Sequence, residues 1–240
     1  MKIALIGYGK MGKAIEQIAQ ERGHSIDAIV NSSNSIDLND LSNCDVAIEF
    51  STPELATKHI VHCFNHQIPI VVGTTGWHHE LESIKTICGE VDGSLIYAPN
   101  FSLGVNIFFE LNKRLAELMS GNIYYQAEVV EVHHLQKLDS PSGTAIELAN
   151  EIISYNKTYT DWKSSNGMKP EVSSSILPIT AIREPEVPGT HTVMYQSEID
   201  SILMTHQAHN RKGFALGAVV AAEWIFGKKG VFTMSNVLNS

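Results

Sequence analysis

The sequence predicts an α/β protein in which a second domain is inserted into the first. Over the first hundred residues, short runs rich in β-branched side chains alternate with helix-period segments, as in βα units around a parallel sheet. Apolar and polar residues then alternate with period two, which indicates strands with one face on a core. We therefore expect a first domain over 1–103 plus 211–240 and a second, α+β domain over 104–210.

Five strands and three helices are expected in the first domain. Apolar positions recur with helical period from Met11 to Ala19 before Gly23 ends that helix, and Pro53 suits the first turn of the next. The expected strands are 2–6, 25–30, 45–50, 70–72 and 94–98, and the expected helices are 11–22, 54–65 and 80–87.

The second domain is expected to hold an open mixed sheet in which most neighbouring strands are antiparallel. Strands are expected at 124–134, 175–183, 191–197 and 200–206, and helices at 105–119 and 144–155. The segment 157–175 is rich in Ser, Lys, Asn and Gly without an apolar period, which predicts a surface loop. A final apolar helix at 214–226 is suited to pack back on the first domain.

Composition argues against several classes of partner. The chain has 26 Asp and Glu against 17 Lys and Arg, a net charge of −9, whereas nucleic acid or an anionic membrane surface needs a basic footprint. No apolar stretch approaches the roughly 20 residues of a membrane span, and the N-terminal apolar run is too short for a signal peptide. Cys44, Cys63 and Cys88 form no CxxC pair, so we expect neither disulfides nor a zinc knuckle, and a cytoplasmic protein.

A glycine pattern marks the end of the first strand. Gly7, Gly9 and Gly12 form a GxGxxG that follows a strand and opens a helix, with Lys10 and Met11 between them. Such a turn lets the backbone approach a pyrophosphate at a helix N-terminus, so it predicts a Rossmann-type dinucleotide-binding domain. The alternative is an ordinary glycine turn.

The residue after the second strand normally selects the dinucleotide. An acidic side chain there binds the ribose hydroxyls, and an arginine binds a 2′-phosphate. This sequence has Asn31 and Ser32 instead, and Lys10 is the nearest evident cation. We therefore expect NADPH or NADH, with a slight preference for NADPH because no carboxylate repels a phosphate.

Two further loops fall at the carboxyl ends of expected strands, where ligands bind in open α/β sheets. The first contains Phe50 and Ser51, and the second contains Gly73, Thr74 and Thr75. Their small side chains and free backbone groups suit a nicotinamide and its ribose. Plain turns, with Ser51 or Thr52 capping the following helix, are the alternative.

The segment 131–145 carries the densest chemistry. His133, His134 and Lys137 follow a strand, and a Ser142-Gly143-Thr144 run opens a helix. Charged donors and unpaired helix N–H groups are both suited to bind carboxylates. A zinc site is disfavoured, because adjacent strand residues face opposite sides, and no metal is expected. The alternative is a solvated basic turn with a capping box over 144–147.

Over nearly its whole length the sequence resembles the 4-hydroxy-tetrahydrodipicolinate reductases, also called dihydrodipicolinate reductases. The family signature E-x-H-H-x-x-K-x-D-[AS]-P-S-G-T is present from Glu131 to Thr144. The resemblance implies reduction, with NADH or NADPH, of a cyclic dicarboxylate on the diaminopimelate and lysine pathway by a homotetramer. It implies that His133 is the catalytic acid or lies beside it, and that Lys137 is a second catalytic cation.

Further roles are implied by position. His134, Gly143 and Thr144 match contacts to the substrate carboxylates, and we add Ser142 beside them. The matching cofactor positions are Gly7, Lys10, Met11, Gly73, Thr75 and Asn100, to which we add Pro99, and Arg211 falls where the family returns to the first domain.

Two rival functions are weighed against this one. An aspartate-type amino-acid dehydrogenase of similar layout should lack the histidine pair followed by Lys137. A protein that senses NAD(H) without turnover should carry a DNA-binding or partner module, and no basic helix-turn-helix segment is evident.

Three histidines, His59, His62 and His66, share one face of an expected helix. Such a stripe could bind a metal, but we expect a solvated polar face opposite the apolar side of that helix.

Overall fold

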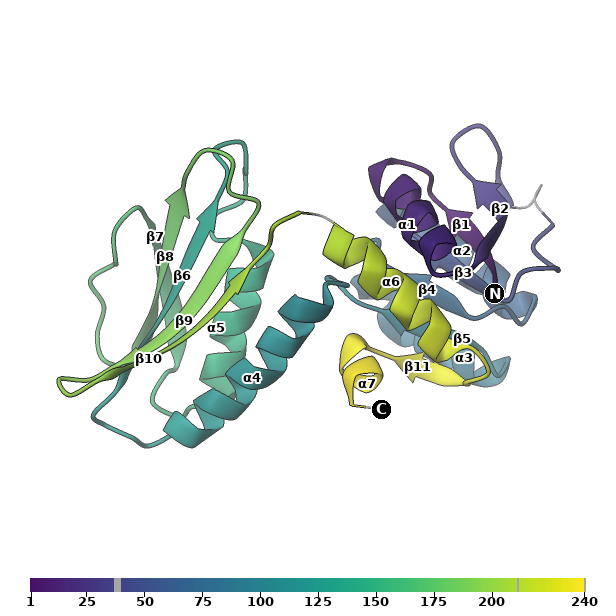
Figure 1. Ribbon diagram of the computed structural model, residues 1–240. Helices are drawn as coiled ribbons and strands as arrows, with labels where there is room; N and C mark the ends of the chain where they lie inside the picture. The colour runs from purple at the N-terminus through teal and green to yellow at the C-terminus, as the bar shows by residue number, and fades with distance from the viewer. Residues whose placement is uncertain (37–39, 211, 240) are drawn as a thin grey trace. The chain divides into compact units, whose positions relative to one another are not determined.

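The computed structural model describes residues 1–36, 40–210 and 212–239, and it divides into two compact units (Figure 1). Unit 1 joins Met1–Asn106 to Lys212–Ser240, and unit 2 is Ile107–Arg211. Each unit is built on one sheet. None of the described helices is both long and apolar enough to cross a membrane.

Unit 1 contains a six-stranded parallel sheet in the order β11-β5-β4-β3-β1-β2. The strands are β1 Lys2–Ile6, β2 Ser25–Val30, β3 Val46–Glu49, β4 Ile70–Val72, β5 Ser94–Tyr97 and β11 Gly230–Phe232. The inner strands are buried on both faces, as parallel strands covered by helices must be. The edge strand β11 was not expected, because its Gly-Val-Phe sequence is short and only partly buried, whereas the equally short β4 is a fully buried β-branched run.

Helices cover both faces of this sheet, and each face has its own core. The helices of unit 1 are α1 Lys10–Glu21, α2 Pro53–Asn65, α3 Leu81–Glu90, α6 Lys212–Ile225 and the short α7 Met234–Leu238, with a 3-10 turn η2 at His78–Glu80. One core includes Ile3, Leu5 and residues of α1 and α6, so the final apolar helix packs on the first domain as predicted. A Cβ on Gly217 of α6 would lie 1.6 Å from the Phe101 carbonyl oxygen, so this contact requires glycine.

Unit 2 contains a five-stranded mixed sheet in the order β10-β9-β6-β8-β7. The strands are β6 Gln126–His133, β7 Asp161–Asn166, β8 Ile176–Arg183, β9 Thr190–Gln196 and β10 Ser201–Gln207. The sheet is mixed, as predicted, but the expectation that most neighbours are antiparallel was wrong. The β10–β9 and β9–β6 pairs are antiparallel, whereas β6–β8 and β8–β7 are parallel.

The difference arises from β7, which lies inside the segment that we expected to be a loop. Its sequence, DWKSSN, is polar, and its side chains remain partly or fully exposed. An edge strand that buries little needs no apolar alternation, so period-two reasoning cannot detect it.

Two helices, α4 Leu103–Met119 and α5 Gly143–Tyr155, pack with one face of this sheet (Figure 1). Inward side chains of β6, β8 and β9, among them Val129, Ile179 and Val193, form the core with α5. Outward side chains on the opposite face include partly exposed apolar residues, namely Val130, Val132, Ile182, Met194 and Leu203.

The register of the central strand β6 determines which polar residues meet. Glu131 lies opposite His191 of β9, and His133 lies opposite Arg183 of β8. Glu131, His133 and His191 are all buried, so the inward face of the sheet becomes polar at this end.

Candidate active site

The glycine turn of unit 1 has the shape of a phosphate cradle. Gly7 has φ +92°, and a Cβ there would lie 2.1 Å from the Phe50 carbonyl oxygen. A Cβ on Gly12 would lie 2.3 Å from the Gly7 carbonyl oxygen, so neither position accepts a side chain. A Cβ on Gly9 would meet nothing within 4 Å, and Gly9 precedes α1 without a side-chain cap. The first N–H groups of α1 are therefore open to an anionic ligand.

The two predicted loops after β3 and β4 pack against each other. The Ser51 backbone N–H donates to Thr74 Oγ1 at 2.8 Å and to Glu49 Oε1 at 3.0 Å. A Cβ on Gly73 would lie 2.2 Å from the Phe50 ring, so this close approach also needs glycine. Thr52 is the N-cap residue of α2.

A cavity of about 620 Å³ lies beside the glycine turn and brings several predicted positions together. It is lined by Gly7, Tyr8, Gly9, Val30, Asn31, Ser32, Ser33, Asn34, Ser35, Ile36, Phe50, Ser51, Thr52, Leu55, Lys58 and His59. Among these described residues there is no Asp or Glu, and Lys58 is the lysine. The sequence offered no sign of Lys58, because the turn of α2 that carries it is remote along the chain from β2.

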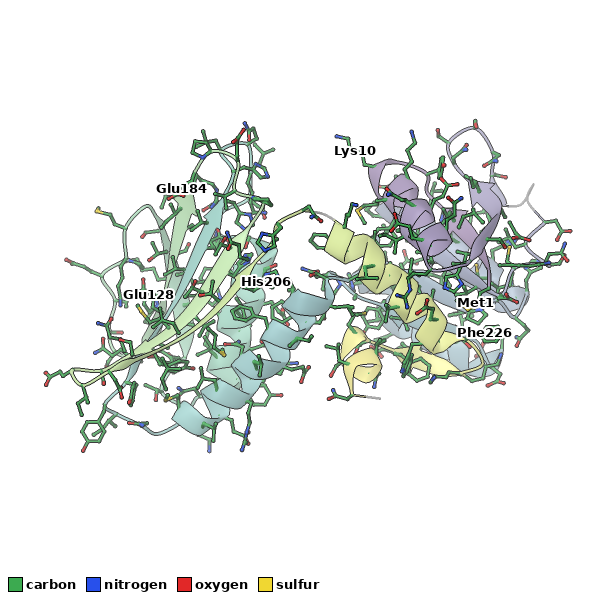
Figure 2. All side chains as sticks on the ribbon, viewed as in Figure 1. Met1, Lys10, Glu128, Glu184, His206 and Phe226 are labelled. Atoms are coloured by element: carbon green, nitrogen blue, oxygen red, sulfur yellow. The ribbon has the colours of Figure 1, made fainter. Side chains whose placement is uncertain are left out.

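Other predicted cofactor residues lie outside this cavity lining. Lys10 extends from the start of α1 into solvent (Figure 2). Asn100 Oδ1 accepts from the Ser102 N–H at 2.8 Å, just before α4. The remaining predicted positions outside the lining are Met11, Gly12, Gly73, Thr74, Thr75 and Pro99. Arg211 lies outside the described residues.

The turn after β2 is held by its own side chains. The Asn31 N–H donates to Asn34 Oδ1 at 2.7 Å, while Asn31 Oδ1 accepts from the Ser33 N–H at 2.8 Å. Ser32 is exposed and lines the cavity. Asn31 therefore shapes the turn, and Ser32 presents its side chain to solvent.

One expectation about the histidine stripe was wrong. His59 is only 5% exposed, and its Nδ1 lies 3.3 Å from both Glu49 Oε1 and Ser51 Oγ. It lies on the inner side of α2, next to buried Ile60, and therefore belongs to the packed face. His62 and His66 stack on each other on the outer side, with ring centroids 4.3 Å apart.

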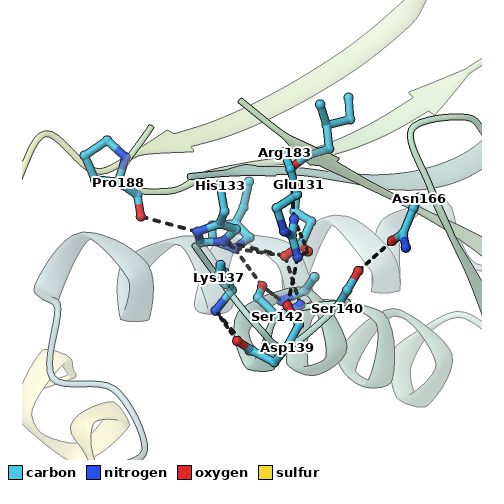
Figure 3. A network of polar contacts seen from close by, with 12 residues as sticks. Glu131, His133, Lys137, Asp139, Ser140, Ser142, Asn166, Arg183 and Pro188 are labelled. Carbon is cyan, nitrogen blue, oxygen red and sulfur yellow. Dashed lines mark hydrogen bonds and ion pairs between the residues drawn. The ribbon is translucent and has the colours of Figure 1, made fainter. Parts of the chain in front are cut away.

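In unit 2, a buried carboxylate organises the predicted catalytic motif (Figure 3). Glu131 is fully buried, and its Oε1 accepts from both terminal nitrogens of Arg183 at 3.1–3.2 Å. Its Oε2 accepts from the Ser142 backbone N–H at 3.0 Å. Three segments remote along the chain, β6, β8 and the start of α5, are thereby joined at one side chain.

His133 ends β6 and is 7% exposed. Its Nε2 lies 3.2 Å from the Nε2 of His191, and its Nδ1 lies 3.3 Å from the Pro188 carbonyl oxygen. A Cβ on Gly189 would lie 2.8 Å from the Cε1 of His133, so glycine lets the loop before β9 pack on the imidazole. Burial lowers the pKa of His133, and the neighbouring Glu131 partly opposes that shift.

α5 does not begin with the capping box over 144–147 that was the alternative prediction from the sequence. Ser142 is the N-cap, and its Oγ accepts from the Ala145 N–H at 3.2 Å. Ser142 is 3% exposed, whereas Gly143 is exposed and Thr144 is partly exposed. The cap therefore falls two residues earlier than expected, and the N–H groups of Gly143 and Thr144 lie in the helix turn that binds anions best.

Lys137 and His134 lie in the turn that leaves β6. The Nζ of Lys137 is 2.9 Å from the Asp139 carboxylate, and this contact lowers the pKa of Asp139. The Nδ1 of His134 is buried and has no hydrogen-bond partner. Lys137 is thus in place to exchange a local carboxylate for one on a ligand.

Sequence reasoning assigned no role to Glu131 or His191 in this site. Glu131, His133 and His191 could also hold a metal ion, since their ligand atoms lie within 4.8 Å of one another. Arg183 already neutralises Glu131, however, which weakens the attraction for a divalent cation. His133 and His191 are 58 residues apart in the sequence, and the pairing of β6 with β9 brings them together. No local sequence pattern encodes that pairing.

Comparison with known proteins covers the whole chain. Residues 1–101 match the family model "Dihydrodipicolinate reductase, N-terminus", and residues 104–238 match "Dihydrodipicolinate reductase, C-terminus". The 4-hydroxy-tetrahydrodipicolinate reductase of Christiangramia forsetii is 51% identical over 241 residues, covering 100% of this chain and 98% of that protein. The enzyme of the same name from Lawsonia intracellularis is 33% identical, covering 99% of each chain.

Solved structures share the fold. A dipicolinate-bound dihydrodipicolinate reductase from a Paenisporosarcina species has a TM-score of 0.75 at 22% identity, covering 97% of each chain. An aspartate dehydrogenase from Thermotoga maritima has a TM-score of 0.52 at 9% identity, covering 95% of this chain and 97% of that one.

Proposed function

The chain belongs to the dihydrodipicolinate reductase family, and on this premise we propose how its residues carry out the reaction. It is an NAD(P)H-dependent oxidoreductase that reduces 4-hydroxy-tetrahydrodipicolinate, via dihydrodipicolinate, to tetrahydrodipicolinate in diaminopimelate and lysine biosynthesis. The observation that supports this function best is that one chain, matched from end to end, carries both a glycine cradle and the 131–144 carboxylate-binding motif.

The residues of unit 1 fit a dinucleotide. Gly7 and Gly12 allow the close turn, Gly9 leaves open space, and the free N–H groups of α1 suit a pyrophosphate. The packed loops that contain Ser51 and Thr74 suit the nicotinamide end. When bound, the reduced nicotinamide supplies the hydride.

We propose that the protein prefers NADPH to NADH. Lys58 and Ser32 line the cavity at the end of β2, and the described part of its lining contains no carboxylate to repel a 2′-phosphate. Lys58 replaces Lys10 as our candidate cation, because Lys10 is outside that lining.

In unit 2, cationic and helix-terminal groups are proposed to hold the two substrate carboxylates. Lys137 supplies a charge, the N–H groups of Gly143 and Thr144 supply donors, and His134 lies in the same turn. Ser142 acts indirectly, because its hydrogen bonds to Ala145 and Glu131 hold the start of α5 in place.

Reduction adds a hydride to a ring carbon conjugated with an imine, and the electron density that this leaves takes up one proton. His133 is proposed to supply that proton, with Lys137 polarising the dianion beside it. Two negative substrate carboxylates near His133 oppose the effect of burial and favour its protonated form.

Assembly and location are also proposals. The partly exposed apolar face of the unit 2 sheet, which includes Val130, Val132 and Leu203, supports a homotetramer. Cys44, Cys63 and Cys88 are all free, which supports the cytoplasm as the compartment.

The test is NAD(P)H oxidation followed at 340 nm with freshly made dihydrodipicolinate synthase product. We expect turnover with that substrate and none with oxaloacetate plus ammonia, the substrates of an aspartate-type dehydrogenase. Turnover only with the second pair would refute the proposal, and binding of NADH without any turnover would favour a sensor.

A further inference from the structure

A second imidazole lies directly behind His133. His191 is on β9, is 5% exposed, and has its Nε2 3.2 Å from the Nε2 of His133. Because the Nδ1 of His133 also faces the Pro188 carbonyl oxygen, both ring nitrogens of His133 have a protein neighbour.

These contacts determine where the protons are. A carbonyl oxygen only accepts, so the Nδ1 of His133 carries a hydrogen. In neutral His133 the Nε2 is then an acceptor, and the Nε2 of His191 is the donor, which also lies 3.1 Å from the Oγ of Ser142. That leaves the Nδ1 of His191 bare, in agreement with its burial without a partner, since an orphaned acceptor costs less than an orphaned N–H.

Charged groups around the two rings come from every neighbouring strand. The Oε2 of Glu131 on β6 lies 3.6 Å from the Nε2 of His133 and 3.8 Å from that of His191. Arg183 of β8 holds Glu131, while Lys137 and His206 of β10 disfavour positive charge on His191. Burial and these neighbours lower the pKa of His191 to about 3, so His191 is neutral at working pH.

We propose that His191 is a positioning residue for the reduction, an inference that rests on the proposed function. Its Nε2 donates to the Nε2 of neutral His133 and accepts from the same atom once His133 is protonated. One proton from water balances this change, since the Nε2 proton of His191 passes to His133 and His191 regains one at Nδ1. Protonated His133 then gives one proton to the substrate, both rings return to their starting tautomers by exchange with water, and Glu131 stabilises the charged state.

The first test reads the protons directly and needs no activity. In protein labelled with ¹⁵N-histidine, imidazole nitrogen shifts report tautomer and protonation. We expect the Nδ1–H tautomer for His133 above its pKa. His191 should be neutral at every pH from 5 to 9, as Nε2–H while His133 is neutral and as Nδ1–H once His133 is protonated. The Nε2–H form of His133, or protonation of His191 within that range, would overturn the assignment.

The second test uses His191→Phe, which keeps a planar ring but neither donates nor accepts. We expect kcat to fall at least 10-fold and the fall of kcat/KM with rising pH to begin at lower pH, because protonated His133 has lost its acceptor. His191→Asn, which can donate and accept, should recover part of both. Tyr195→Phe removes a buried polar atom from the same face of β9 outside this network, and serves as the matched control.

The outcomes separate the two proposals. Equal pH profiles and kcat values in His191→Phe and Tyr195→Phe would overturn the positioning role while the reductase function stands. Absence of NAD(P)H oxidation by the unmodified protein would refute the function, whereas the ¹⁵N result would still decide the tautomers. If His191→Phe does not fold, as judged by circular dichroism, the proposal is tested with His191→Asn and the ¹⁵N measurement instead.

Discussion

Replacing Lys58 with Met should weaken use of NADPH without affecting use of NADH. The side chain is exposed and lines the cavity beside Ser32, so it meets a 2′-phosphate in largely aqueous surroundings. Two unit charges about 4 Å apart interact by about 1 kcal/mol in water, and a phosphate monoester carries about −1.5 to −2 charges. Loss of the ammonium should therefore cost about 1–2 kcal/mol, or about 5–30-fold in kcat/KM for NADPH.

The assay compares kcat/KM for the two cofactors at saturating dicarboxylate substrate, in the parent protein and in Lys58→Met. Lys10→Met is the matched control, because Lys10 is also an exposed lysine but lies outside the cavity lining. We expect the Lys10 variant to change both cofactors by the same factor. The difference between parent and Lys58→Met should shrink as salt is raised, since exposed charges are screened within about 10 Å at 0.1 M ionic strength.

Two results would refute this reasoning. An equal loss with NADH and NADPH would place Lys58 at a group that both cofactors share, such as the pyrophosphate. A parent protein that prefers NADH more than about tenfold, or about 1.4 kcal/mol, would show that the Ser32 and Lys58 end of the cavity does not hold a phosphate at all.

Three further predictions follow from the second unit. His133→Gln should lower kcat by about 10²–10⁴ with little change in KM, whereas Lys137→Ala should damage both constants; both should still bind NADPH by fluorescence, and near-normal kcat in His133→Gln would contradict the acid role. Burial raises the pKa of Glu151 to about 7, so the stability that this carboxyl contributes is present below its ordinary pKa near 4.5 and is lost as the pH rises to 7. Glu151→Gln should therefore raise Tm at pH 8 but not at pH 4.5. An equal change of Tm at both pH values would contradict this role of Glu151. Val132→Asp should give a smaller assembly by light scattering, and an unchanged mass would exclude that face as an interface.

Local patterns predicted most of the fold because most elements carry their own signal. The glycine turn, the strand–helix alternation of unit 1 and the final apolar helix each rest on residues close together in sequence. The polar edge strand β7 has no such signal, because its pairing with β8, and not its own burial, makes it a strand.

The site divides in the same way. His133 and Lys137 could be singled out because they share one short motif with the start of α5. No role could be assigned from the sequence to His191, Arg183 or Lys58, since strand register and helix orientation bring them to their partners across long stretches of chain. Burial of Glu131 likewise depends on which face of β6 meets the core.

The position of α6 and β11 late in the sequence affects the order in which the two units fold during synthesis. A ribosome completes all of unit 2 before it adds Lys212–Ile225 and Gly230–Phe232, yet these segments supply the core helix beside α1 and the edge strand beside β5. The nascent N-terminal hundred residues must wait for them with one sheet face covered by α1 alone, while the later-synthesised unit already has every strand and helix of its own. Unit 2 is therefore expected to gain protease resistance on the ribosome before unit 1 does, and loss of the last thirty residues should unfold the beginning of the chain.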